Sequence, residues 1–199
     1  MRFLCLHGWG TNSQFVEGHL ASEMFPELRE VTSSTDEFFS YADIEDMDSC
    51  LRALELLDSY VTAEGPFDGV LAFSQGAIIA ASYLARRRQL GQLSKKSALP
   101  FKCAIFFSAP AVYRIENGQL RAMTRDVDGE MINIPTAHIW GSNDTTINGQ
   151  AISDLCASDT REIYVHEGGH EVPGARMNSA VKSSVQIIRR VISMASYEQ

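Results

Sequence analysis

A serine, an aspartate and a histidine each follow a short apolar run of this 199-residue chain, in that order. Ser74 follows "GVLAF", Asp144 follows "TAHIWGSN" and His170 follows "REIYVHEGG". A serine hydroxyl is a weak nucleophile, which an imidazole activates by accepting its proton, while a carboxylate holds that imidazole in the required tautomer. We therefore predict Ser74 as a nucleophile, His170 as its general base and Asp144 as the acid that orients the base.

The segment around Ser74 favours a nucleophile on a sharp strand-to-helix turn. Residues 72–76 are "AFSQG", which matches the nucleophile-elbow pattern Gly-x-Ser-x-Gly except for Ala72 in place of the first glycine. Ala72 adds one methyl group, which we expect the turn to tolerate, and Gly76 lets the following helix pack close to the strand. The backbone N–H groups of Gln75 and of Trp9, in "HGWG", are the expected donors to an oxyanion.

Simpler interpretations exist for the serine and the aspartate. Ser74 could only cap a helix, because serine favours the N-cap position, and Asp144 could only be a turn residue in "SNDTT". Asp154 and Asp159 are alternative acids. The pattern places these two within or after a helix and not at a strand end, so Asp144 is preferred.

The other histidines are expected to be structural. His166 competes with His170 for the role of the base, but it lies inside a strand pattern, whereas Gly168-Gly169 give His170 a flexible loop. We interpret His7 as a turn residue whose ring bonds nearby backbone. His138 lies in the middle of a strand pattern and is expected to be a satisfied core residue.

The elements that must position these residues alternate along the chain. Helical patterns cover 48–62, up to Gly65-Pro66, and 75–90, up to Gly91, and a third runs from Met177 to Val191. The five apolar runs predicted as strands are continuous, as in a parallel sheet covered on both faces; they are 2–6, 69–73, 101–108, 136–141 and 161–166. We expect one α/β domain over residues 1–199, with ligands at the carboxyl ends of the strands.

Composition excludes several classes of partner. The net charge of −8 disfavours nucleic acid and anionic membranes, and no apolar run is long enough to span a bilayer. The four cysteines show no C-x-x-C spacing, and the five histidines form no ligand cluster. We therefore expect a reduced, cytoplasmic protein without a metal site.

Four segments resemble the FSH (family of serine hydrolases) group of α/β-hydrolases. They are "LCLHGWGTNSQ", "GPFDGVLAFSQGA", "HIWGSNDTTI" and "EGGHEVP", and the resemblance runs from Leu4 to Pro173. It implies an α/β-hydrolase fold without a large cap domain, the triad Ser74, Asp144 and His170, and oxyanion donors at Trp9 and Gln75. The group consists of small esterases and thioesterases that need no cofactor.

The same resemblance suggests a class of substrate. Many fungal members of the group are encoded beside polyketide synthases, and "FFSYAD" is similar to an aromatic segment of such members. The implied reaction is hydrolysis, through an acyl-enzyme, of an ester or of a CoA- or carrier-bound acyl thioester. The implied partner is an acyl carrier domain of a polyketide synthase, in secondary metabolite biosynthesis.

The chain departs from the family between the first strand and residue 30. In the family a full helix and a second strand follow "HGWGTNSQ", whereas here "FVEG", similar to the end of that strand, follows at once. Residues 7–14 are too few for a crossover, which needs about ten to twelve residues. Either the first crossover helix and most of the strand are missing, or residues 14–25 form the helix, between Ser13 and Pro26, and 28–33 form the strand.

This departure leaves alternatives for the function. The helix after "HGWG" would position the Trp9 amide, so a shortened 11–30 region suggests, as an alternative, a catalytically impaired or silent binding protein with the same fold. A peptidase or a lactonase is a third possibility. For an enzyme, we expect the connection from Ala109 to Pro135 to cross the strand ends, so that an apolar acyl site is lined by Trp9, Phe73, Tyr113 and Met123.

Overall fold

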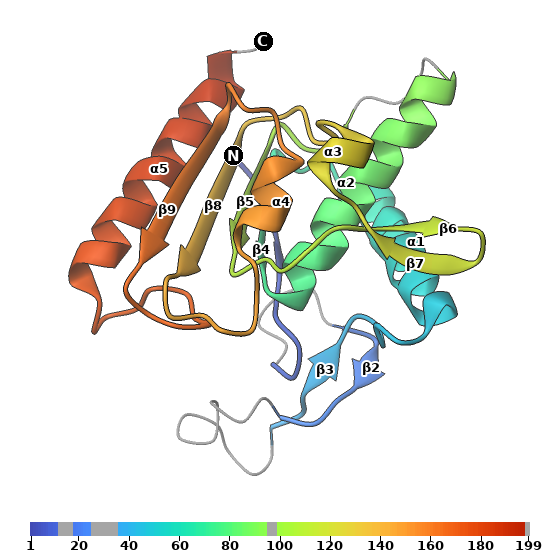
Figure 1. Cartoon of the computed structure of the whole chain (residues 1–199), viewed down its shortest axis with the longest axis horizontal. Coiled ribbons are helices and arrows are strands. Elements are labelled where there is room, and N and C mark those ends of the chain that lie inside the picture. The colour runs from blue at the N-terminus through green and yellow to red at the C-terminus, as the bar shows by residue number, and fades with distance from the viewer. Residues whose placement is uncertain (12–17, 25–35, 95–98, 198–199) are drawn as a thin grey trace.

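Five parallel strands form one sheet in the computed structural model, which describes residues 1–11, 18–24, 36–94 and 99–197 (Figure 1). All neighbouring strands in the sheet run parallel. Their order across the sheet is β1 (Phe3–Leu6), β4 (Gly69–Phe73), β5 (Cys103–Phe107), β8 (Thr136–Gly141) and β9 (Arg161–His166). Three of the five predicted apolar runs match these strands residue for residue, and the runs 2–6 and 101–108 are longer than β1 and β5 by one and three residues. The predicted α/β class is confirmed.

Helices cover both faces of this sheet, which explains why the strands are apolar on both sides. Helices α1 (Met47–Glu64) and α2 (Gln75–Ser94) lie on one face, and α5 (Asn178–Tyr197) lies on the other (Figure 1). Helix α5 buries Ile187 and Val191 in a cluster that includes Ile105 and Ile139 of the sheet. The two faces thus carry separate hydrophobic cores.

Each of the three long helices differs at an end from its prediction, and α5 continues to Tyr197, past the predicted end at Val191. Asp46 is the N-cap of α1, where its side chain accepts a hydrogen bond from the Asp48 N–H at 2.9 Å, and Gly65 ends the helix as predicted. Helix α2 continues past Gly91 to Ser94, so the prediction that it ends at this glycine was wrong. An interior glycine costs only about 1 kcal/mol, which the buried face of α2 offsets.

Two antiparallel hairpins and two short helices complete the described elements. The hairpin of β6 (Tyr113–Glu116) and β7 (Gln119–Ala122) lies in the connection between β5 and β8 and turns at Asn117-Gly118, where both residues have positive φ. Asn-Gly is favoured in such two-residue turns. The short helices are α3 (Arg125–Asp128) and α4 (Gln150–Asp154).

The second hairpin overturns the prediction of a helix over residues 14–25. Strand β2 (Leu20–Ala21) pairs with β3 (Phe39–Ser40), and the described residues between β1 and α1 include no helix. Gly18 approaches the backbone of Ser40 so closely that a Cβ atom would lie 2.4 Å from the Ser40 carbonyl oxygen. This glycine therefore serves a close backbone contact and not a helix. The strand expected at 28–33 lies outside the described residues.

Candidate active site

The residue that follows β4 occupies a strained turn at the carboxyl edge of the sheet. Ser74 has φ of 51°, in the left-handed region that non-glycine residues rarely adopt. Its N–H donates to the Phe107 carbonyl at 3.0 Å, and α2 begins at the next residue. The backbone thus turns sharply from strand to helix with the Ser74 side chain at the apex, as the elbow pattern predicts.

Small residues make this turn possible. Gly76 lies against the end of β1, where a Cβ atom would be 2.4 Å from the His7 carbonyl oxygen and 2.8 Å from Leu6. Gly8 lies against the Phe73 ring, and a Cβ atom on Gly8 would be only 2.8 Å from a carbon of that ring. Ala72 is fully buried, and its methyl group is accommodated beside the turn.

Ser74, His170 and Asp144 lie in one hydrogen-bonded chain. The Ser74 Oγ atom is 2.8 Å from His170 Nε2, and His170 Nδ1 is 2.7 Å from Asp144 Oδ2. The Asp144 side chain is shielded from solvent, while 15% of the His170 side chain remains exposed. With Nδ1 as donor to the carboxylate, Nε2 is free to accept the serine proton.

A fourth residue, Thr146, holds the acid. Both its N–H, at 3.0 Å, and its hydroxyl, at 2.6 Å, donate to Asp144 Oδ1. Burial raises the pKa of Asp144, but the hydrogen bonds from Thr146 and His170 outweigh it and hold the pKa below its ordinary value. The carboxylate therefore stays ionised at neutral pH. The sequence analysis missed Thr146, although a Thr two residues after an Asp is typical of an Asx turn.

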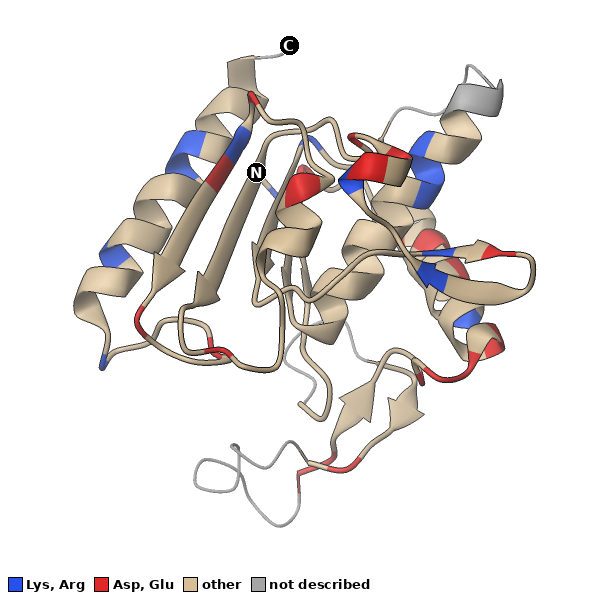
Figure 2. Ribbon diagram, in the orientation of Figure 1, with Lys and Arg blue, Asp and Glu red and all other residues tan. Residues whose placement is uncertain are grey.

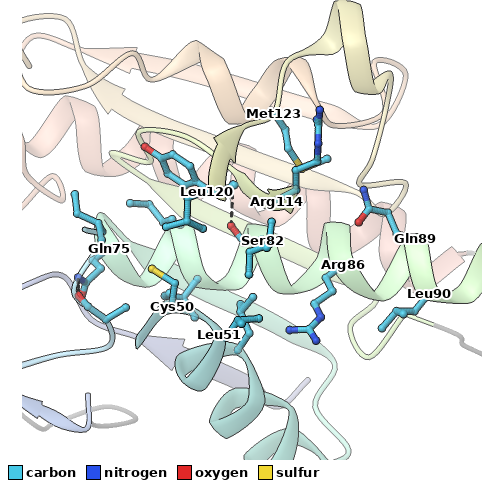
Figure 3. A pocket seen from close by; sticks show the side chains of 17 residues that line it. Cys50, Leu51, Gln75, Ser82, Arg86, Gln89, Leu90, Arg114, Leu120 and Met123 are labelled. Atoms are coloured by element: carbon cyan, nitrogen blue, oxygen red, sulfur yellow. Dashed lines mark hydrogen bonds between the residues drawn. The ribbon is translucent and has the colours of Figure 1, made fainter. Parts of the chain in front are cut away.

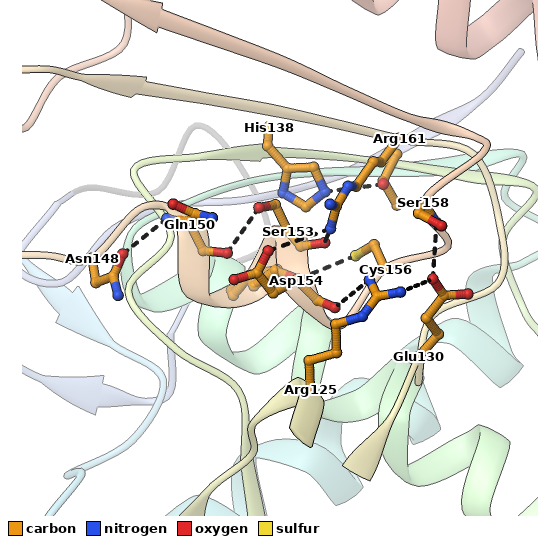
Figure 4. Close-up of polar contacts among 12 residues, drawn as sticks. Arg125, Glu130, His138, Asn148, Gln150, Ser153, Asp154, Cys156, Ser158 and Arg161 are labelled. Carbon is orange, nitrogen blue, oxygen red and sulfur yellow. Dashed lines mark hydrogen bonds and ion pairs between the residues drawn. The ribbon is translucent and has the colours of Figure 1, made fainter. Parts of the chain in front are cut away.

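The alternative acids and bases have other partners. Asp154 forms an ion pair with Arg161 (3.5 Å) in a polar cluster around α4 (Figure 4), and Asp159 is exposed. His166 is buried, and its Nδ1 accepts from the Gly168 N–H at 3.1 Å at the start of the loop that carries His170.

Two further histidines are structural. His138 is buried beside Phe106, with Nε2 2.9 Å from the Thr136 hydroxyl. Its Nδ1 has no hydrogen-bond partner among the described residues, so the expectation of a fully satisfied core histidine was wrong for this nitrogen. His7 bonds the backbone through both ring nitrogens, to the Gly8 carbonyl at 2.6 Å and the Gly18 N–H at 3.0 Å.

Hydrogen bonds and a ring contact fix the loop that carries Trp9, although the described residues between this loop and α1 include no helix. The His7 ring stacks on Tyr41, and the Thr11 hydroxyl donates to the Gly8 carbonyl at 3.0 Å. The Gly10 N–H donates to the Phe39 carbonyl of β3, also at 3.0 Å. Strand β3 thus anchors this loop at the edge of the sheet.

The Gln75 side chain has a role that the sequence analysis did not foresee. Its Oε1 accepts from the Tyr41 N–H at 2.8 Å, and its Nε2 donates to the Ala42 carbonyl at 2.7 Å. This amide therefore fixes the segment between β3 and α1 to the start of α2. The Gln75 backbone N–H is the first of that helix, and the first four N–H groups of a helix have no acceptor within it.

A cleft of about 1,100 Å³ surrounds Ser74 and His170. Three of the four residues predicted for the acyl site line it, namely Trp9, Phe73 and Tyr113, and the Phe73 ring also packs beside His170 with centroids 5.2 Å apart. Met123 does not line this cleft, so the four residues predicted for the acyl site divide between two cavities. Met123 lines a second cavity, which Tyr113 also lines.

Known proteins match both the sequence and the structure. A family model described as serine hydrolase (FSH1) matches residues 25–181. Esterase FPY3 of Fusarium mangiferae is 32% identical over 221 aligned positions that cover 98% of each chain, and hydrolase phiM of Talaromyces stipitatus is 26% identical over 87% of this chain and 81% of its own.

Solved structures support the fold. A Bacillus cereus carboxylesterase superposes with a TM-score of 0.59, covering 95% of this chain and 88% of its own at 14% identity. Esterase PE8 gives a TM-score of 0.57 at 16% identity, covering 93% of this chain and 91% of its own.

Among the described residues, no helix is both long and apolar enough to cross a membrane.

Proposed function

This chain belongs to the serine hydrolase (FSH1) family, and from that premise we propose that it hydrolyses a carboxylic ester or acyl thioester through an acyl-enzyme on Ser74. The observation that carries the proposal is the hydrogen-bonded chain from Ser74 through His170 to Asp144, with distances of 2.8 and 2.7 Å. Membership in a hydrolase family and a serine hydroxyl hydrogen-bonded to an imidazole both support hydrolysis through a serine nucleophile.

In the proposed reaction, Ser74 Oγ attacks the acyl carbon while His170 Nε2 accepts its proton. Asp144 stabilises the imidazolium and keeps the ring in position. The backbone N–H groups of Gln75 and Trp9 donate to the developing oxyanion, a role that suits the first N–H of α2 because a helix N-terminus favours negative charge. His170 then protonates the leaving alcohol or thiol. Water, activated by the same base, releases the acid.

The test is intact mass after treatment with a fluorophosphonate probe. We expect one adduct on the parent protein and none on Ser74→Ala. As a matched control, Ser142→Ala changes an exposed serine that follows β8 and should label like the parent. A folded parent that forms no adduct would contradict the proposal and favour the alternative of a silent binding protein with this fold.

The charge of the cleft favours an uncharged leaving group. The described residues that line the cleft include Glu23, Asp43 and Glu171 but no Lys or Arg, and Figure 2 shows further acidic residues in the segment leading into α1. Together with the net charge of −8, this rim repels the phosphates of CoA. A carrier domain, if it is the partner, would have to present a neutral or basic surface here.

We therefore expect a neutral octanoyl thioester of N-acetylcysteamine to be a better substrate than octanoyl-CoA at low salt. The two share their acyl group and their thiol chemistry, so kcat/KM compares the leaving groups alone. The difference should shrink as salt rises from about 0.01 M to about 0.15 M, since screening shortens the reach of surface charges from about 30 to about 8 Å. A preference for octanoyl-CoA at low salt would overturn this part of the proposal.

A further inference from the structure

A second cavity, of about 600 Å³, lies between α1, α2 and the β6–β7 hairpin (Figure 3). One face of α2 forms its floor from Gln75 to Leu90, α1 contributes Cys50, Leu51 and Leu54, and the hairpin covers it with residues that include Ile115 and Leu120. A volume of this size is within the range of small-molecule sites.

This cavity adjoins the cleft that holds Ser74. Both are lined by the same five residues: Ala42, Ile44, Gln75, Ile78 and Tyr113. Gln75 directly follows the nucleophile in sequence. The acyl chain of a substrate whose carbonyl lies at Ser74 can therefore extend from the cleft into the second cavity.

The lining of the cavity is suited to an apolar ligand. Its rim leaves large apolar side chains exposed, with 59% exposure for Ile44, 48% for Leu90 and 36% for Ile115, and burying them against an apolar ligand would be favourable.

The polar groups of the wall between the ends already have partners. The Ser82 hydroxyl accepts from the Tyr113 N–H at 3.1 Å, and Arg114 forms ion pairs with Asp128 and Glu116.

The length of the cavity follows from the helix that forms its floor. Gln75 and Gln89 of α2 both line the cavity and lie at opposite ends of it in Figure 3. Their separation of fourteen residues corresponds to about 21 Å of α-helix. An extended alkyl chain, with bonds of roughly 1.5 Å, advances by roughly 1.3 Å per carbon and would need about 16 carbons to span it. Arg86 and Gln89 make the far end polar.

We propose that this cavity is the acyl-chain site, and that the enzyme selects long apolar acyl groups of up to about 16 carbons. The proposal rests on the proposed function, because it takes the acyl carbonyl to be at Ser74. The acyl chain runs along α2 beneath the hairpin. Tyr113 lies where the cleft meets the cavity, and Leu51 and Leu120 lie on facing walls. Arg86 and Gln89 set the upper limit of length.

The first test is a series of p-nitrophenyl esters from acetate to hexadecanoate. We expect kcat/KM to rise several-fold with each added pair of methylene groups, because each buried methylene favours binding, and to level off once the chain reaches the polar end. If kcat/KM of the parent is the same for the acetate and for the dodecanoate, the proposal is overturned.

The second test narrows the cavity from opposite walls. Leu120→Trp on β7 and Leu51→Trp on α1 should each lower the ratio of kcat/KM for dodecanoate to that for acetate by tenfold or more. Gln119→Trp is the matched control, because neighbouring residues of a strand face opposite ways and Gln119 is exposed and does not line the cavity. This control should keep the parent's ratio. An unchanged ratio in both cavity variants would overturn the proposal.

A binding measurement separates this inference from the proposed function. N-methyl dodecanamide, which resists hydrolysis, should bind Ser74→Ala in calorimetry, and Leu120→Trp in the same background should weaken it at least tenfold. If that binding is found but the parent forms no fluorophosphonate adduct, the cavity assignment stands and the hydrolase proposal fails. If the adduct forms but the amide binds equally to both variants, only the cavity assignment fails.

Discussion

At the scale of single residues, the orientation of His170 depends on how firmly Asp144 is held. Asp144 Oδ1 accepts two hydrogen bonds from Thr146, and Oδ2 lies 2.7 Å from the imidazole. The Thr146 hydroxyl is also 3.2 Å from His170 Nδ1. Thr146 thus borders both members of the pair and acts on the nucleophile only through them, as a positioning residue.

We expect Thr146→Val to lower kcat several-fold with little change in KM. Valine keeps the shape and the backbone N–H but removes a hydroxyl bond worth about 1 kcal/mol. Steady-state kinetics on one ester measures the effect. Thr146→Ser should restore kcat, and Thr145→Val, next to it in an exposed position, should behave as the parent. If Thr146→Val raises KM and leaves kcat unchanged, Thr146 does not position the base.

The sequence predicts residues whose role follows from their place at a strand end, and it misses those whose role depends on a distant partner. Ser74, Asp144 and His170 each follow an apolar strand, so parallel pairing alone brings them to one edge. The Gln75 side chain bonds Tyr41 and Ala42, more than thirty residues away. No local pattern indicates that contact.

At the scale of elements, the close packing of α2 on β1 sets the position of the Ser74 turn. Gly76 in the first turn of α2 touches the last residue of β1 and the one after it, Leu6 and His7, and its N–H donates to the His7 carbonyl at 3.0 Å. Any side chain here meets backbone atoms, which cannot rotate away. The glycine therefore fixes the distance between the helix N-terminus and the loop that carries Trp9.

Gly76→Ala should destabilise the protein and reduce activity together. Its methyl group would lie 2.4 Å from the His7 carbonyl oxygen, and overpacking of this kind costs about 1–3 kcal/mol. Urea unfolding and ester kinetics measure the two effects. The control is Gly174→Ala, an exposed position where an added Cβ has no neighbour within 4 Å. Unchanged stability in Gly76→Ala would show that α2 can shift freely away from β1.

Buried strands and long helices were predictable because each carries its own apolar pattern. The short hairpins were not, since β2 and β3 have two residues each and are defined by pairing across the chain. The turn at Asn117-Gly118 did carry a local signal for the β6–β7 hairpin, and the sequence analysis did not use it. One of the two alternatives for this region placed Gly18 in a helix, because a close backbone contact leaves no trace in periodicity.

At the scale of the whole molecule, the shifted histidines and carboxylates all have lowered pKa values. Burial, together with the charge of Arg161, lowers the pKa of His138 to about 3. Burial also lowers the pKa of His19 and of His166. The shifted carboxylates, which include Asp144, likewise have lowered pKa values. In each case the unfolded chain binds protons more readily than the folded protein, so acid favours unfolding.

His138 should dominate the loss of stability between neutral pH and pH 5. Its ordinary pKa is about 6.5, so below that pH the unfolded chain takes up a proton that the folded protein, with a pKa of about 3, excludes. Its contribution is present above pH 6.5 and is lost as the pH falls, by about 2 kcal/mol between pH 7.5 and 5.0. The carboxylates add their losses only below their ordinary pKa values, near pH 4.

Urea unfolding of the parent and of His138→Gln at these two pH values tests this assignment. Glutamine cannot titrate, and its amide can still donate to the Thr136 hydroxyl. We expect the variant to be less stable than the parent at pH 7.5. On acidification to pH 5.0, its free energy of unfolding should fall by about 2 kcal/mol less than that of the parent. His19→Gln, at an exposed position, should reduce the loss far less than His138→Gln does. An equal loss in the parent and in His138→Gln would mean that the acid sensitivity arises elsewhere in the fold.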